Sequence, residues 1–151
     1  MNEFELLSNW GVQKTSQNYM RLLEAIDIEH EFKGQFGHPS SYARVAFRVK
    51  PAEELSLEFE ANWPAAFDSI YTLRIQHSIA EAVLDGLFID LHFPHRGCAL
   101  TLTTLGWDEI GGSEVAVRKA TSKAMEKLKA QGKWAQVTGR SREYHAPPNN
   151  G

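Results

Sequence analysis

Three stretches of alternating apolar and polar residues constrain the fold of this chain more than any other feature. They cover residues 26–33, 43–50 and 55–61, and every second side chain in them is apolar, with His30 as the exception. Successive side chains of a β-strand point to opposite faces of a sheet, so this period indicates strands with one buried and one solvated face. Consecutive strands joined by a short turn are usually antiparallel neighbours, and we therefore expect the third stretch to pair with the second.

Charged side chains occupy the solvated face of these strands. The second stretch contributes Arg44, Arg48 and Lys50, and the stretches on either side contribute Asp27 and several glutamates. A basic row on a sheet can bind nucleic acid, but opposite charges on adjacent strands also pair, with a gain of about 0.2–1 kcal/mol each. Because acidic rows are expected on both sides of the basic row, we interpret this face as solvated and charge-paired.

Residues 65–87 have the periodicity of a helix with two apolar stripes. A helix that lies on a sheet needs only one such stripe. The second stripe therefore has to meet another helix, the N-terminal segment or another chain. In the last case it would form a homodimer through Ile70, Leu73 and Leu84.

A fourth strand, beginning at residue 98, leads through a glycine-rich loop to a second helix. Ser113 is a suitable N-cap and Glu114 suits the first turn, so we expect this helix to run to about residue 130. The arc opposite its core stripe is basic and consists of Arg118, Lys119, Lys123 and Lys127. Such an arc is either an ordinary solvated face or a surface for an anion or RNA.

The chain has the length of one domain, 151 residues, and its formal charge of −3 conceals an asymmetry. Residues 1–112 carry 8 basic and 16 acidic side chains, whereas residues 113–151 carry 8 and 3, so the positive charge belongs to the second helix and the tail. The single cysteine, Cys98, favours a reducing compartment. No apolar run approaches the ~20 residues of a membrane span. We expect a cytoplasmic protein with no membrane segment.

Several short motifs occur in an order that resembles the fourth domain of elongation factor G, the translocation GTPase. Gly-Gln-Phe-Gly-His at residues 34–38 resembles a Gly-Gln-Tyr-Gly-His segment of that domain, and residues 81–86 resemble the Glu-Ala…Gly end of its first helix. The strand at residues 100–102, followed by Ser-Glu-Val-Ala-Val at residues 113–117, resembles its strand–loop–helix passage. Together the motifs cover about residues 26–130.

The resemblance implies an α+β fold with a four-stranded sheet, two helices packed on one face and a left-handed βαβ crossover, here with an extra N-terminal segment. In the factor, loops at the tip of this domain touch transfer RNA and messenger RNA in the decoding region of the ribosome. The corresponding tip would combine residues 34–41 and 106–112, with Phe36, His38 and Trp107 as binding residues. The alternative is that the large aromatic side chains fold back over the end of the core.

The chain departs from this family in three respects. It has no Gly-x-x-x-x-Gly-Lys-Ser/Thr phosphate-binding loop, so the sequence shows no recognisable GTPase domain. Residues 39–42 look like an insertion before the second strand. The second tip loop is shorter and carries Trp107, Asp108 and Glu109 where the family has a histidine, and its carboxylates would repel phosphate.

Asp90, His92 and His95 are the nearest approach to a metal-binding cluster, because residues two apart on an extended segment share a face. A small metal-dependent enzyme built on them is one hypothesis. Nothing in the sequence places further ligands beside them, so we assign no metal, no cofactor and no catalytic residue. Cys98 lies in the apolar register of a strand and is expected to be an inert buried thiol.

We divide the chain into an N-terminal extension (1–25), a single domain (26–145) and a flexible tail (146–151). The preferred hypothesis is a non-enzymatic module that binds the ribosome or a structured RNA through the tip loops and the basic face. The alternative is a protein-interaction or homo-oligomerisation module with no role in nucleic-acid binding.

Overall fold

Four strands form a mixed sheet in the order β2-β3-β5-β4. The structure is a computed structural model and describes residue 4, residues 18–34 and residues 41–138. β2, β3 and β5 are antiparallel neighbours, whereas β4 runs parallel to β5. The strands are β2 (Ile26–Lys33), β3 (Tyr42–Pro51), β4 (Ser56–Phe59) and β5 (Cys98–Gly106).

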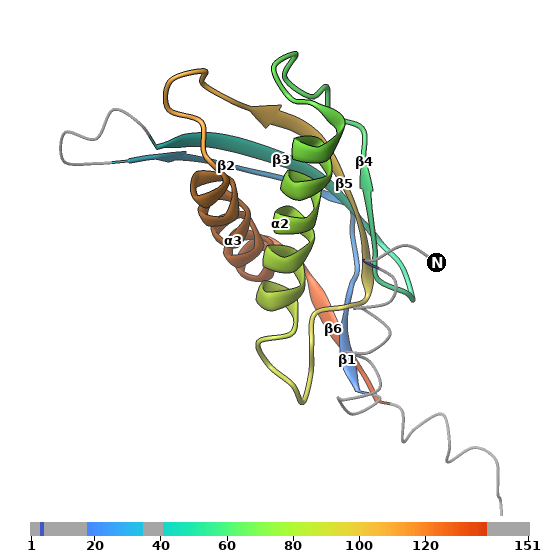
Figure 1. Cartoon of the computed structure of the whole chain (residues 1–151). Helices are drawn as coiled ribbons and strands as arrows, with labels where there is room; N and C mark the ends of the chain where they lie inside the picture. The colour runs from blue at the N-terminus through green and yellow to red at the C-terminus, as the bar shows by residue number, and fades with distance from the viewer. Residues whose placement is uncertain (1–3, 5–17, 35–40, 139–151) are drawn as a thin grey trace, which may run out of the picture.

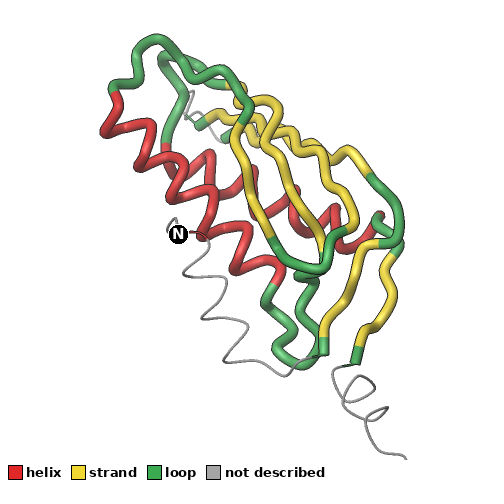
Figure 2. Tube along the Cα trace, turned by 90° about the vertical axis from the view of Figure 1, so that its right-hand side faces the viewer, coloured by secondary structure: helices red, strands yellow, loops and turns green. Residues whose placement is uncertain are grey.

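Two helices, α2 (Ser69–Leu87) and α3 (Glu114–Gln131), cover one face of this sheet (Figure 1). Seen from the side, they form a layer of their own, and no described element covers the opposite face (Figure 2). Both helices begin at the same end of the sheet, because each follows one of the two parallel strands. The α+β architecture expected from the sequence is confirmed.

The connection β4–α2–β5 is a crossover between parallel strands. In the view with α2 in front of the sheet and β4 pointing upward, β5 lies to the left of β4 (Figure 1). The crossover is therefore left-handed, which is the rare hand for such a connection and the one that the family resemblance implied.

The expected pairing of residues 55–61 with residues 43–50 is wrong, because β5 lies between β3 and β4. β3 has ten residues and β4 only four, so a direct pair would leave most backbone groups on that edge of β3 unbonded. The longer β5 pairs with β3 over eight residues instead. The basic row of β3 consequently has an acidic row beside it only on the β2 side.

The core lies between the helices and the helix-facing register of the strands. It also includes Phe4 and Leu22, which precede the main sheet in the chain. The largest fully buried side chains include Phe47, Leu100, Leu102, Ile75, Ile79, Met125 and Leu128.

Polar caps fix where the two helices begin. The prediction placed the start of α2 at residue 65, but Asp68 is its N-cap and accepts a hydrogen bond from the Tyr71 amide at 2.7 Å. α3 begins as predicted after Ser113, whose hydroxyl oxygen accepts a hydrogen bond from the Ala116 amide at 3.1 Å. Neither helix of the described part is long and apolar enough to cross a membrane.

A second, smaller sheet consists of β1 (Tyr19–Leu22) and β6 (Trp134–Val137), which are antiparallel. Neither of these two short strands is predicted from the sequence. β1 is also bonded to the segment before β5, because the Met20 amide donates to the Pro94 carbonyl at 2.8 Å and the Gly97 amide donates to the Met20 carbonyl at 2.9 Å. The small sheet thus attaches the chain before β2 and after α3 to the main domain.

Gly86 lies at a close approach of the two helices, and its replacement tests their packing. A Cβ atom at this position would lie 2.8 Å from Cβ of the fully buried Met125. Alanine forms helices better than glycine by about 1 kcal/mol. We nevertheless expect Gly86→Ala to lower the free energy of unfolding by about 1–3 kcal/mol, because α2 and α3 would have to separate.

Chemical denaturation measures this change, and Asp85→Ala on the exposed neighbouring position is the control. The control should alter stability by no more than about 0.5 kcal/mol. A Gly86→Ala variant as stable as the parent would contradict the close packing of the helices.

Candidate functional site

The expected tip lies only partly within the described structure. Phe36 and His38 are outside the described residues. Trp107 follows β5, and its indole packs edge-on against Phe67 and Tyr71, with ring centroids 4.8 and 6.1 Å apart. Trp107 is half-buried and covers the end of the core, so it does not stand free at a tip.

Internal hydrogen bonds hold the loop of residues 107–113. Asp108 Oδ1 accepts a hydrogen bond from the Ile110 amide at 3.0 Å, and the Asp108 carbonyl accepts one from the Gly112 amide at 2.6 Å. A side chain at Gly112 would collide with the Trp107 indole. The loop is therefore closely packed, and it exposes the carboxylates of Asp108 and Glu109.

The predicted basic face of α3 does not form a single surface. Arg118 Nη1 donates to Glu81 Oε1 of α2 at 2.7 Å, and the other oxygen of this carboxylate lies 3.1 Å from His77 Nε2. The hydrogen bond from Arg118 holds the pKa of Glu81 below its usual value. Lys127 comes nine positions after Arg118, which places the two side chains about 180° apart around a helix with 3.6 residues per turn. Arg118 belongs to the contact between α2 and α3.

The other three basic residues of the arc lie on the side of α3 that is next to β2. Lys127 Nζ donates to the Glu29 carbonyl at 2.9 Å, and Lys119 Nζ lies 5.3 Å from the centre of the Phe32 ring. Lys123 is one helical turn from each of these lysines. We call Lys119, Lys123 and Lys127 the lysine strip.

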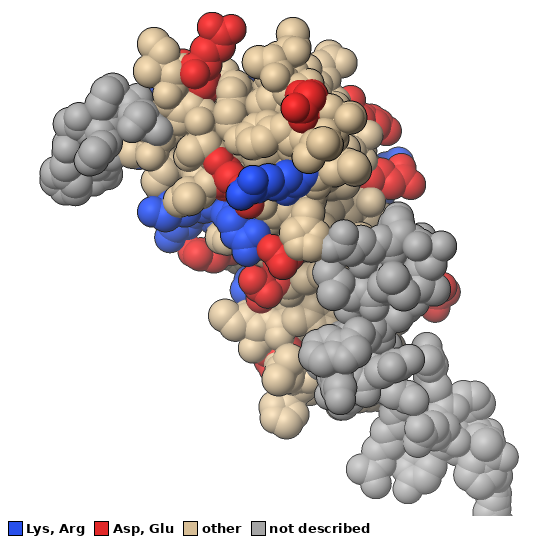
Figure 3. Space-filling view, in the orientation of Figure 1, with Lys and Arg blue, Asp and Glu red and all other residues tan. Residues whose placement is uncertain are grey.

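The alternation of β2 separates charge between the two sides of the sheet. Its acidic side chains lie on the open face, where Arg44 is 2.9 Å from Glu29, whereas His30 and Phe32 face α3. Burial first, and then Lys127 and Lys123, lower the pKa of His30, with Glu126 acting in the opposite direction. Figure 3 shows basic side chains gathered over α3 on the helix side of the molecule, with some acidic side chains among them.

The loop of residues 88–97 contains Asp90, His92 and His95 but does not assemble a metal site. Asp90 Oδ1 accepts hydrogen bonds from the amides of His92 at 2.9 Å and Phe93 at 3.3 Å, which is a turn. The ring of His95 instead packs edge-on against Trp134 at 4.8 Å. Among residues 18–34 and 41–138, no three His, Cys, Asp or Glu side chains are placed to hold a metal ion.

Cys98 is fully buried at the start of β5. Burial raises the pKa of its thiol to about 12, so the reactive thiolate is absent at neutral pH. Its sulfur is 3.8 Å from the backbone carbonyl of His95. The expectation of an inert buried thiol agrees with this environment.

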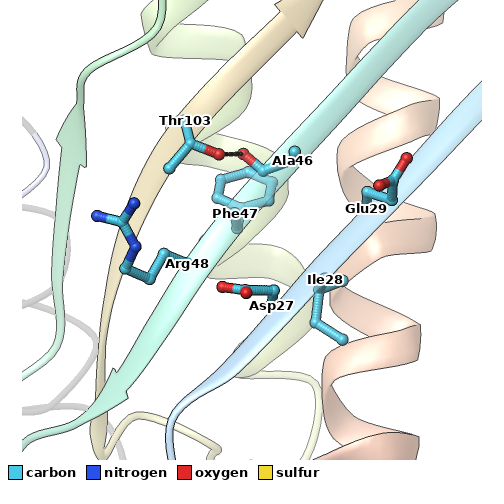
Figure 4. A pocket seen from close by; sticks show the side chains of 7 residues that line it. All are labelled: Asp27, Ile28, Glu29, Ala46, Phe47, Arg48 and Thr103. Atoms are coloured by element: carbon cyan, nitrogen blue, oxygen red, sulfur yellow. Dashed lines mark hydrogen bonds between the residues drawn. The ribbon is translucent and has the colours of Figure 1, made fainter.

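A hollow of about 200 Å³ lies on the open face of the sheet (Figure 4). The register of β3 and β5 slips there, because Thr103 is an extra residue in β5, and its hydroxyl donates to the Ala46 carbonyl at 3.2 Å. Asp27 and Arg48 border the hollow, and Arg48 also lies 3.8 Å from Glu60. Arg48 pairs with Glu60 and Glu29 pairs with Arg44, both of which lie outside the lining, so we assign no ligand to the hollow.

The sequence of β5 contains a signal for this bulge. Its buried leucines alternate at Leu100 and Leu102, but the next buried residue, Leu105, comes three positions later. Side chains three positions apart in a regular strand point to opposite faces. Leu102 and Leu105 can therefore both be buried only if the strand contains a bulge with one extra residue between them.

Comparison with family models gives no match for this chain, and comparison with curated proteins gives none either. Solved structures do match, with 62 chains in all, so the architecture recurs in other proteins. One is a crystal structure of a protein from Thermus thermophilus, with a TM-score of 0.65 and 21% sequence identity.

That match covers 82% of this chain and 18% of the Thermus thermophilus chain. This chain therefore spans less than a fifth of that protein's length. At such low identity the likeness shows the fold alone, because one fold can carry many unrelated functions.

The titration of His30 tests the position of the lysine strip. Because the pKa of His30 is lower in the folded than in the unfolded chain, its neutral form stabilises the fold fully above pH ~6.5, and this contribution is lost as the pH falls from there toward the folded pKa. We expect Lys123→Gln combined with Lys127→Gln to raise the pKa of His30, since two nearby positive charges are removed.

A histidine ring titration followed by NMR measures this pKa. Glu126→Gln is the matched control and should lower the pKa of His30 further, because it removes a nearby negative charge. An unchanged pKa in the double lysine variant would show that the strip does not act on His30.

Proposed function

We propose that this protein is a non-enzymatic RNA-binding module, and that the lysine strip contacts the RNA backbone. The observation that carries the proposal is the separation of charge at β2. Lys119, Lys123 and Lys127 lie on the side of the sheet opposite to the acidic side chains of β2. Neutralised phosphates supply most of the affinity of non-specific nucleic-acid binding, so a surface with mainly one sign of charge is its first requirement.

The proposal includes a relationship to the fourth domain of elongation factor G, and so to ribosomal or other structured RNA as the partner. The motifs at residues 34–38, 81–86 and 113–117 support this relationship. The left-handed crossover β4–α2–β5 also agrees with the fold that the resemblance implies. The similar fold in the Thermus thermophilus protein covers a small part of a much longer chain, which suits an architecture that serves elsewhere as one domain of several.

We assign RNA contact to the lysine strip and not to the loop of residues 107–113. Trp107 packs inward on Phe67, and the exposed carboxylates of Asp108 and Glu109 would repel phosphate. The strip lies beside β2, which leads directly into the Gly-Gln-Phe-Gly-His motif at residues 34–38. RNA bound along the strip would thus approach the end of β2 at Lys33.

The alternative homodimer through Ile70, Leu73 and Leu84 receives less support. Leu84 is half-buried and packs against the core, whereas Ile70 and Leu73 are largely exposed. The three residues therefore do not form a single exposed interface. The exposed residues Ile70 and Leu73 belong to another surface of the molecule.

Binding of transfer RNA across a salt series tests the proposal. We expect Lys119→Glu combined with Lys123→Glu to weaken binding at least tenfold at about 0.1 M salt. The slope of log K against log salt should fall by about 2, since roughly one phosphate contact is lost at each position.

Arg48→Glu combined with Lys50→Glu is the matched control, because it changes the net charge equally on the open face of the sheet. The control should retain most of the affinity. Equal losses in the two double variants, or no binding by the parent protein at low salt, would refute RNA binding by the strip.

A further inference from the structure

Exposed apolar side chains gather where both helices begin. Seven large apolar side chains are exposed among the described residues, and four of them come from two segments at this end of the helical layer. Single exposed apolar residues are common on soluble proteins, whereas a group in one place marks an interaction site. We call this group the apolar end, and it consists of Ile70 (77% exposed), Leu73 (64%), Ile110 (81%) and Val115 (59%).

Contacts between α2 and α3 bring these segments together. Arg74 Nε donates to Glu114 Oε1 at 2.8 Å, so the second turn of α2 lies beside the first residue of α3. Ile70 and Leu73 lie within one turn of Arg74 on α2, and Val115 directly follows Glu114 on α3.

The loop before α3 completes the surface. The edge-on packing of Trp107 against Phe67 and Tyr71 fixes this loop to the start of α2. The Ile110 amide is held by Asp108 Oδ1 at 3.0 Å, while the Ile110 side chain remains the most exposed of the large apolar residues. The apolar end is therefore a preformed surface, and binding there requires little ordering of the chain.

Acidic side chains accompany the apolar end. Asp68, Asp108 and Glu109 are exposed in the loops that precede the two helices. Arg74, in the second turn of α2, already pairs with Glu114. Figure 3 shows acidic side chains standing out at this end from a surface that is otherwise uncharged in that view.

These charges indicate which kind of partner fits. In a two-fold dimer the apolar end would meet its own copy, and the carboxylates around it would face one another, which is unfavourable. RNA would meet the same repulsion. A protein surface with apolar side chains flanked by Lys or Arg would gain both apolar burial and complementary charge.

We propose that the apolar end binds a basic amphipathic segment of a partner protein. The apolar face of that segment covers Ile70 and Ile110 and their neighbours, and its Lys or Arg side chains lie beside the three exposed carboxylates. This surface is separate from the lysine strip, so the inference does not rest on RNA binding.

A designed helical peptide of about 18 residues, with leucines on one face and lysines on the other, is the probe for this surface. Amide NMR spectra of the full chain measure its binding and its location. Two control peptides are a scrambled sequence of the same composition, which has no apolar face, and a version with glutamates in place of the lysines. We expect the basic amphipathic peptide to bind at least tenfold more tightly than either control, with shifts centred on residues 68–73 and 108–115.

Two sets of variants separate the apolar and charged contributions. Ile70→Ser with Ile110→Ser should weaken binding at least tenfold. Ile89→Ser with Leu91→Ser, at two other exposed apolar positions after α2, should not. Asp68→Asn, Asp108→Asn and Glu109→Lys together should weaken binding at least fivefold, and the two asparagines can still accept the hydrogen bonds from the Tyr71 and Ile110 amides.

Several results would overturn the proposal. They are equal binding of the scrambled peptide, shifts confined to another surface, no binding at millimolar peptide, or a charge variant that binds as tightly as the parent. Sedimentation of the parent protein as a dimer that Ile70→Ser with Ile110→Ser dissociates would assign the apolar end to a second copy of this chain instead.

Discussion

The parallel pairing of β4 with β5 determines where each surface of this protein lies. Because the two strands point the same way, α2 and α3 leave the sheet from the same end and run side by side in the same direction. This arrangement places Glu114 next to Arg74 and gathers both helix starts at one end. It also places α3 on the β2 side of α2, where its lysines contact β2.

Local sequence patterns predicted the elements that are marked by residues close together in the chain. The alternation at residues 26–33 and 43–50 and the cap at Ser113 correspond to β2, β3 and the start of α3. Pairing was not predictable in the same way, because alternation shows which side of a strand is buried but not which strand lies beside it. β1 and β6 have four residues each and depend on partners distant in the chain, so they have little local signal.

The candidate surfaces were harder to predict, since charge patterns on one element do not reveal the charges opposite to it. A helical wheel places Arg118 and Lys119 on the same arc, but Arg118 binds Glu81 of α2, whereas Lys119 lies over the Phe32 ring of β2. The segregation of lysines from carboxylates arises from the side-chain directions of β2 and not from the division of the sequence into acidic and basic parts. The sequence predicts a binding role for Trp107 at the tip, but its inward packing depends on Phe67 and Tyr71, forty and thirty-six positions earlier in the chain.

The hydrogen bond from Lys127 to the Glu29 carbonyl also affects how the sheet can grow. β2 is an edge strand of eight residues, and exposed edges of this length can recruit a strand from another molecule and lead to aggregation. The Lys127 ammonium group donates a hydrogen bond to one backbone carbonyl of β2, that of Glu29, at a distance of 2.9 Å. An incoming strand would have to displace that group while desolvating its charge. Strand addition at β2 is thereby opposed by a side chain from the neighbouring layer.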